Sequence, residues 1–121
     1  VSDEQKKIYD IVLKAQLASL EILRSGLKCS DGDKAARDVI TEAGYGEFFR
    51  HSTGHGVGIE IHEKPNLSPK SVTTLRTGNI VTVEPGIYIP GKFGVRIEDM
   101  ALITENGCQN LTNAAKELVI L

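Results

Sequence analysis

The sequence has few cysteines, no block of basic residues and no long apolar run. Its two cysteines, Cys29 and Cys108, lack CxxC spacing, which favours two reduced thiols over a disulfide or a metal role. The formal net charge is −2, so we expect no nucleic-acid partner. No apolar run approaches the roughly 20 residues that span a membrane, and residues 1–7 do not resemble a signal peptide. We therefore expect a cytoplasmic protein without a membrane partner.

The length of the chain suits a single domain over residues 1–121. A chain of 121 residues with 40% hydrophobic side chains can bury one core but leaves little room for two. The sequence begins on Val1 rather than on a methionine, directly before a helix-capping residue. We expect it to be a piece of a longer polypeptide.

Two amphipathic helices are expected in the first third of the chain. Ser2 reads as an N-cap, and Gln5 completes a capping box for a helix from Asp3 to about Arg24. Its apolar stripe comprises Ile8, Val12, Ala15, Leu20 and Leu23, and Gly26 is expected to close it. A second helix is expected from about Asp33 to Ala43, with Gly44 after its end.

The rest of the chain reads as strands and turns. We expect a short strand near Phe48–Arg50, a strand over Asn79–Glu84, and extended chain at Ile87–Ile89. Further expected elements are a hairpin loop over Pro90–Gly94 and strands over Val95–Thr104 and about Glu117–Leu121.

All three histidines lie in one stretch of twelve residues. His51, His55 and His62 are interspersed with glycines, which let a backbone bend or approach a ligand closely. Histidine is the commonest metal ligand and an acid or base near neutral pH, so we interpret the stretch as one wall of a catalytic metal site. Because positions 55 and 62 differ by an odd number, the chain must bend near Gly56–Gly58 for both to serve one site.

The hairpin predicts a second part of that site. If its centre is near Gly91, Glu84 falls opposite Glu98, and like charges facing one another repel. Two facing carboxylates need a proton or a cation between them. A metal ion would fill that role; the alternative is a salt-bridge cluster in which Arg96, on the same face as Glu98, joins the two glutamates.

Several motifs together resemble the pita-bread metallopeptidases, most closely the Xaa-Pro dipeptidases (prolidases) and Xaa-Pro aminopeptidases of family M24. They are His51-x-x-Gly54-His55-x-x-Gly58 with His62-Glu63, Thr82-Val-Glu84-Pro85-Gly86, and Val95-Arg96-Ile97-Glu98-Asp99. The resemblance implies an α+β fold: half of a pita-bread fold, with two helices packed on a curved, mostly antiparallel sheet. It also implies that residues 1–121 are the C-terminal portion of the catalytic domain.

The resemblance implies a role for each candidate residue. His55, Glu84 and Glu98 match metal ligands, with Glu98 bridging two divalent ions, and His62, His51 and Arg96 match residues that contact substrate, shape its pocket and hold the ligand carboxylates. Manganese or cobalt is expected, with zinc as an alternative. The implied reaction is hydrolysis of the peptide bond before proline in a dipeptide or peptide, through a metal-activated water.

The family site also has two aspartate ligands from an upstream Asp-x-Gly strand and a nearby position, which these 121 residues do not match. We therefore expect weak or absent metal binding and little activity from this chain alone. We expect self-association, or a need for the missing N-terminal half. Two alternatives are a creatinase-type enzyme or methionine aminopeptidase, and a non-catalytic peptide-binding module; the hairpin from Pro90 to Glu98 and the retained ligands argue against them.

Overall fold

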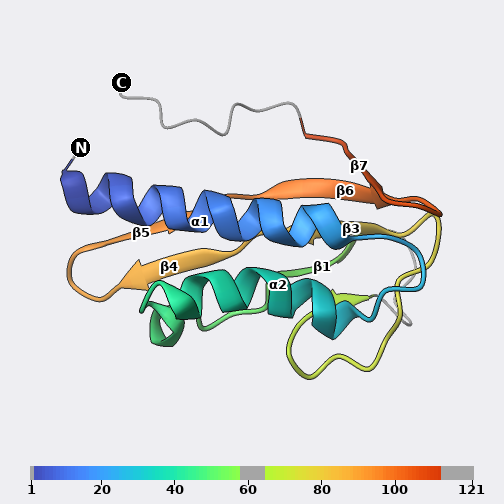
Figure 1. Cartoon of the computed structure of the whole chain (residues 1–121), viewed down its shortest axis with the longest axis horizontal. Coiled ribbons are helices and arrows are strands. Elements are labelled where there is room, and N and C mark those ends of the chain that lie inside the picture. Colours follow the sequence, from blue (N-terminus) through green and yellow to red (C-terminus); the bar gives the residue numbers. More distant parts are fainter. Residues whose placement is uncertain (1, 58–64, 113–121) are drawn as a thin grey trace.

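Two helices cover one side of an antiparallel β structure (Figure 1). The computed structural model describes residues 2–57 and 65–112, so the expected strand at 117–121, His62 and Gly58 lie outside the described residues. The elements are α1 (Asp3–Ile22), α2 (Cys29–Glu42), the 3₁₀ helix η1 (Gly46–Phe48), β1 (Gly54–Val57), β2 (Asn66–Leu67), β3 (Ile80–Val83), β4 (Gly86–Ile89), β5 (Phe93–Arg96), β6 (Asp99–Ile103) and β7 (Cys108–Asn110).

Helix α1 begins as its sequence predicts. The Ser2 hydroxyl accepts from the Gln5 amide at 3.1 Å, and the Gln5 side chain accepts from the Ser2 amide at 2.9 Å, which completes the capping box. The helix ends at Ile22, so the prediction that it reaches Arg24 is wrong by two residues. Leu23 is already extended, and beyond it the Ser25 amide donates to Thr104 O. No helix of the described residues is long and apolar enough to cross a membrane.

Helix α2 begins at Cys29, four residues before the predicted start at Asp33. The Ser-Asp-Gly-Asp segment looks like a cap and turn but lies inside the helix. Gly32 is buried there, where an added Cβ would lie 3.1 Å from Leu67 and 3.2 Å from Leu23. The glycine therefore allows α2 to pack closely against these two leucines, and at the helix start the Cys29 amide donates to Thr73 O.

The strand predicted near Phe48–Arg50 is wrong. Residues Gly46–Phe48 form a turn of 3₁₀ helix, closed by the Phe48 amide donating to Tyr45 O and the Phe49 amide to Gly46 O. The carbonyl of Phe49 then accepts from Arg37, a side chain of α2, rather than from a strand. The short helix brings the chain from α2 to the histidine stretch.

All strand pairs are antiparallel, in a five-stranded sheet of order β2-β1-β3-β6-β7 and a β4-β5 hairpin. Partner residues in both the β3-β6 and β4-β5 ladders are symmetric about Gly91, which confirms the predicted register. The single strand predicted over Val95–Thr104 is instead divided into β5 and β6, because the pairing is interrupted at residues 97–98. The added strand β7 was not predicted.

The core lies between the helices and one face of the strands. One buried cluster joins the helices to the hairpin and includes Ile8, Val12, Ala36, Ile40, Ile87 and Ile97. A second includes Leu23, Cys29, Leu67, Val81, Val83 and Ala101. Alternation along β1 and β6 leaves His55, Val57 and Met100 exposed on the face that the helices do not cover.

Cys29 provides a test of this core. Its thiol is fully buried and is not joined to Cys108 in a disulfide. Burial raises the pKa of Cys29, although a hydrogen bond with Ser71 partly opposes this effect. We expect Cys29 in a Cys108→Ser variant to react with a thiol reagent more than about tenfold more slowly than Cys108 in a Cys29→Ser variant. Comparable rates at pH 8 would contradict the buried position.

The raised pKa also fixes the direction of a pH effect. An unfolded thiol ionises from about pH 8.5 upward, whereas the folded Cys29 keeps its proton to higher pH. The unfolded state then binds fewer protons, so the contribution of Cys29 to stability is lost as the pH rises above that value.

Candidate metal centre

His55 and Glu84 face one another on the sheet face that the helices leave uncovered. Nε2 of His55 lies 3.6 Å from Oε2 of Glu84, and the side chains are 58% and 15% exposed. His55 is in the middle of β1, and Glu84 directly follows β3, the neighbouring strand. Their main chains are fixed by the His55 amide donating to Thr82 Oγ1 at 3.0 Å and the Glu84 amide donating to Thr53 O. Two groups of ligand type thus meet across neighbouring strands.

The His55 ring turns its Nε2 atom toward Glu84. Its Nδ1 lies 3.1 Å from the Gly56 carbonyl oxygen, which can only accept, so the ring proton belongs on Nδ1. In the neutral ring the lone pair is then on Nε2, the atom that faces the Glu84 carboxylate. Two electron-pair donors facing each other need a proton or a cation between them, and ligating histidines typically donate their other ring N–H to a carbonyl. The pair fits a divalent metal ion.

Glu98 shares the register of this pair, but among the described residues it forms no ion pair or hydrogen bond with His55 or Glu84. The β3-β6 ladder ends at Val83↔Asp99, and the β4-β5 ladder begins at Gly86↔Arg96. Continuing either ladder by its own register places Glu98 opposite Glu84. Glu98 forms a long, half-exposed ion pair with Arg96, whose Nη2 lies 4.0 Å from Oε1 of Glu98. Within residues 2–57 and 65–112, no group of three or more His, Cys, Asp or Glu could hold a metal ion. The structure brings two of the three predicted ligands together.

His51 lies beside the pair and presents an unused acceptor. Its Nδ1 is 2.7 Å from Ser52 O, which leaves the lone pair on Nε2, and Nε2 is buried without a hydrogen-bond partner in the described part of the chain. The ring packs edge-on against Phe49 and Tyr88, with centroids 5.0 and 5.5 Å away. A cavity of about 600 Å³ is lined by His51, Ser52, Gly54, His55, Asn66, Glu84, Tyr88 and Arg96. Four of the six candidate residues therefore line one cavity.

Comparisons with known proteins show the family of the chain. The sequence profile of metallopeptidase family M24 matches residues 1–105. The chain belongs to metallopeptidase family M24. It is 51% identical to an Xaa-Pro dipeptidase of Pyrococcus horikoshii over 98% of the chain and 34% of that relative.

Solved structures of Xaa-Pro peptidases share the fold of the chain. The chain matches an Xaa-Pro dipeptidase from Bacillus anthracis with a TM-score of 0.95 and 55% identity, over 99% of the chain and 34% of that protein. It matches an X-Pro aminopeptidase from Thermotoga maritima with a TM-score of 0.90 and 46% identity, over 96% and 33%. The α+β arrangement of two helices on a mostly antiparallel sheet is half of the pita-bread fold of these M24 proteins. The chain spans about a third of the length of the relatives it matches.

A buried ion pair in the M24 chain holds the histidine stretch in place, and the sequence reasoning missed it. The Asp33 carboxylate is 1% exposed and accepts from Nε of Arg37 at 2.8 Å and from Nη2 at 3.0 Å. It also accepts from the Thr53 hydroxyl and amide, while Arg37 donates to the carbonyls of Phe49 and His51 at 2.8 Å. The sequence did carry a signal for this ion pair, since Asp33 and Arg37 are four residues apart on the predicted helix.

Replacing Asp33 with alanine is expected to lower the free energy of unfolding by about 3 kcal/mol. This is the lower end of the range for breaking a buried pair, because the Arg37 side chain is 25% exposed. The matched control is Asp38→Ala, which removes an exposed i,i+4 partner of Lys34 on the same helix and should leave the urea midpoint nearly unchanged. Equal midpoint shifts for the two variants would contradict this role of Asp33.

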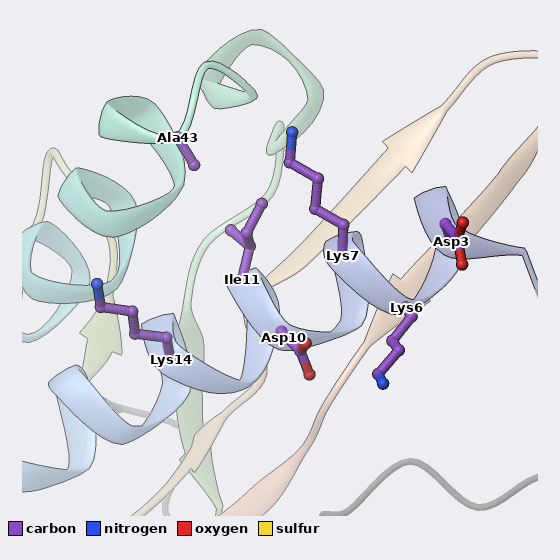
Figure 2. A pocket seen from close by; sticks show the side chains of 7 residues that line it. All are labelled: Asp3, Lys6, Lys7, Asp10, Ile11, Lys14 and Ala43. Carbon is purple, nitrogen blue, oxygen red and sulfur yellow. The ribbon is translucent and has the colours of Figure 1, made fainter.

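A second cavity, of about 620 Å³, lies on α1 near the end of α2 and has no comparable chemistry. It is lined by Asp3, Lys6, Lys7, Asp10, Ile11, Lys14 and Ala43. Figure 2 shows Lys7 and Lys14 on the side of α1 toward Ala43, while Lys6 and Asp10 point away on the other side. Because these charged groups spread apart, we assign no ligand site to this surface.

Proposed function

We propose that residues 1–121 are the C-terminal portion of the catalytic domain of an Xaa-Pro exopeptidase, and that they supply His55, Glu84 and Glu98 to its metal centre. The observation that carries the proposal is the Nε2–Oε2 approach of His55 and Glu84, in a chain 51% identical to an Xaa-Pro dipeptidase. The reaction is hydrolysis of the peptide bond before proline. The names of the relatives favour this reaction over a creatinase or methionine aminopeptidase activity.

The donor set suggests which metal is bound. One imidazole with carboxylate oxygens is a hard ligand set that suits manganese, with cobalt and zinc as further candidates. A bound divalent ion supplies a Lewis acid that polarises the substrate carbonyl and lowers the pKa of water. Glu98 would be the carboxylate shared by both ions of a two-metal site, and Nη2 of Arg96 lies 4.0 Å from its Oε1.

The remaining candidate residues face the substrate. His51 offers a buried Nε2 acceptor in the cavity and packs against Tyr88, so it limits the shape of the pocket. Arg96 lines the same cavity and carries the positive charge there. His62, which lies outside the described residues, contacts the substrate and stabilises the reacting carbonyl.

The rest of the active site comes from protein outside these 121 residues. Two further carboxylate ligands are required for a two-metal centre, and the exposed Val57 and Met100 lie on the same uncovered face as His55. We infer that this face packs against the other half of the catalytic domain, and that in its absence the chain self-associates. The isolated chain is accordingly weak in metal binding and inactive.

A chimera tests the proposal. This chain replaces the matching third of the Pyrococcus horikoshii relative, and release of proline from Xaa-Pro dipeptides and longer Xaa-Pro peptides is measured with and without manganese. We expect metal-dependent cleavage by the chimera and none by the isolated 121-residue chain. A folded chimera that fails to cleave, or cleaves peptides without proline equally well, would overturn the proposal. So would efficient cleavage by the isolated chain.

A further inference from the structure

The inference concerns the junction at which both proposed acidic ligands lie. The β3-β6 ladder ends at Val83↔Asp99, and the β4-β5 ladder begins at Gly86↔Arg96 in the same register. The stretch between the ladders consists of residues 84–85 on one strand and 97–98 on the other. It therefore contains Glu84 and Glu98, and its geometry sets the separation of their carboxylates.

Pro85 leaves this junction short of one hydrogen-bond donor. The Ile97 amide donates to Pro85 O at 3.3 Å, as expected for an antiparallel pair. The reciprocal bond to Ile97 O cannot form, because proline has no N–H. The neighbouring Glu84 amide is committed to Thr53 O on the other side. Ile97 is nearly fully buried, so its carbonyl needs a donor from the protein.

Gln16 of α1 supplies that donor. Its Nε2 donates to Ile97 O at 3.3 Å and to Val83 O at 3.2 Å, so one amide group joins the two strands. These carbonyls belong to the residues directly before Glu98 and Glu84. The contact reaches across more than 60 residues of sequence and comes from the middle of the helix that covers the junction.

The environment of Gln16 argues that this bridge is the reason for an amide at that position. The side chain is fully buried, among the apolar residues Val12 and Ala15 of the same helix. Its Oε1 is buried without a hydrogen-bond partner among the described residues. A buried polar atom left without a partner costs about 1–3 kcal/mol. An apolar side chain would avoid that cost but would leave the carbonyl of Ile97 without a donor.

We propose that Gln16 is a positioning residue of the metal centre: its amide replaces the donor that Pro85 lacks and fixes the separation of Glu84 and Glu98. This inference rests on the proposed function, in which both glutamates bind the same metal centre. Gln16 touches neither metal nor substrate, and it acts through the backbone of the residues that precede the two ligands.

The test uses Gln16→Met in the chimera, since methionine keeps the volume and removes both donors. The Mn²⁺ dissociation constant, measured by isothermal titration calorimetry, is expected to rise about 10–100-fold. In the metal-free chimera, hydrogen–deuterium exchange of peptides spanning residues 84–98 is expected to be faster than in the parent. If Gln16→Met does not fold, Gln16→Asn makes the same comparison, because its amide is one methylene too short.

Ser19→Ala is the matched control. Ser19 is equally buried on α1, but its hydroxyl donates to Gly32 O at 2.9 Å and so ties α1 to α2 rather than to the strands. Its loss is expected to lower the melting temperature while leaving the Mn²⁺ dissociation constant within threefold. Equal weakening of metal binding by both variants would overturn the positioning role and indicate general destabilisation.

A second-site change tests the chemistry of the bridge. Pro85→Ala in the Gln16→Met background restores an N–H at the position that can donate to Ile97 O, and we expect it to recover at least tenfold in Mn²⁺ affinity. No recovery, or a dissociation constant for Gln16→Met within threefold of the parent, would overturn the inference. Failure of the parent chimera to bind Mn²⁺ would instead count against the proposed function, and the exchange measurement still decides whether Gln16 holds the junction.

Discussion

Glu84→Gln in the chimera is expected to lower metal-dependent cleavage of an Xaa-Pro dipeptide by more than about 100-fold. Loss of an outer partner of a metal site costs roughly 10–100-fold, and loss of a charged ligand should exceed that range. Glutamine keeps the shape of the side chain, and the backbone amide of residue 84 can still donate to Thr53 O. The change therefore removes a charge from the position that faces His55 Nε2, with little effect on the fold.

The control for this prediction is Glu105→Gln, which neutralises an exposed glutamate in the turn between β6 and β7. Its activity is expected to remain within twofold of the parent chimera. Activity of Glu84→Gln within threefold of the parent at saturating manganese would show that the carboxylate is not a ligand. Measuring the Mn²⁺ dissociation constant of the parent chimera and of both variants separates loss of bound metal from loss of the chemical step.

Gly54→Ala is expected to prevent stable folding, with a loss of more than about 4 kcal/mol in the free energy of unfolding. A Cβ at Gly54 would lie 1.7 Å from the carbonyl oxygen of Thr82 and 2.7 Å from its carbonyl carbon. These are backbone atoms of β3, so they cannot turn aside as a side chain would. Strand β1 cannot shift away either without breaking the bond from the His55 amide to Thr82 Oγ1.

Gly107→Ala is the matched control for the packing of Gly54. Among the residues that the structure describes, a Cβ there meets only Thr104 Oγ1, at 4.0 Å, so we expect a change within about 1 kcal/mol. Circular dichroism during urea unfolding gives both values. A Gly54→Ala variant with a normal unfolding midpoint would contradict the close approach of β1 and β3, and with it the placement of His55 beside Glu84.

Features encoded by neighbouring residues were predictable from the sequence. The capping box of Ser2 and Gln5 and the apolar stripe of α1 are local patterns, and both are confirmed. The register about Gly91 is also local, since a short turn fixes the pairing of the strands that it joins. That register places Glu98 opposite Glu84, which carried the sequence argument for a cation.

Features decided by distant contacts were not predictable in the same way. At the start of α2 the Cys29 amide donates to the carbonyl of Thr73, a residue 44 positions away in the sequence. After η1, the carbonyls of Phe49 and His51 accept hydrogen bonds from the Arg37 side chain rather than from a neighbouring strand. The interruption of the strand before β6 follows from Pro85 on the opposite strand, which lacks a donor.

The candidate site divides along the same line. The spacing of the histidines and the hairpin geometry indicated which residues to examine, and His55 and Glu84 do approach one another. The residues that support the site carried little signal in the sequence, because Gln16 looks like any other polar residue of an amphipathic helix. Its partners, Val83 and Ile97, lie 67 and 81 positions away, and only the folded chain brings their carbonyls to one amide.

The most direct test of the central claim is the position of the metal itself. Crystals of the chimera grown with manganese and measured near the manganese absorption edge give an anomalous difference map. We expect a peak about 2.0–2.3 Å from Nε2 of His55 and from carboxylate oxygens of both Glu84 and Glu98. Manganese bound elsewhere in the protein, with His55 and Glu84 left uncoordinated, would contradict the account.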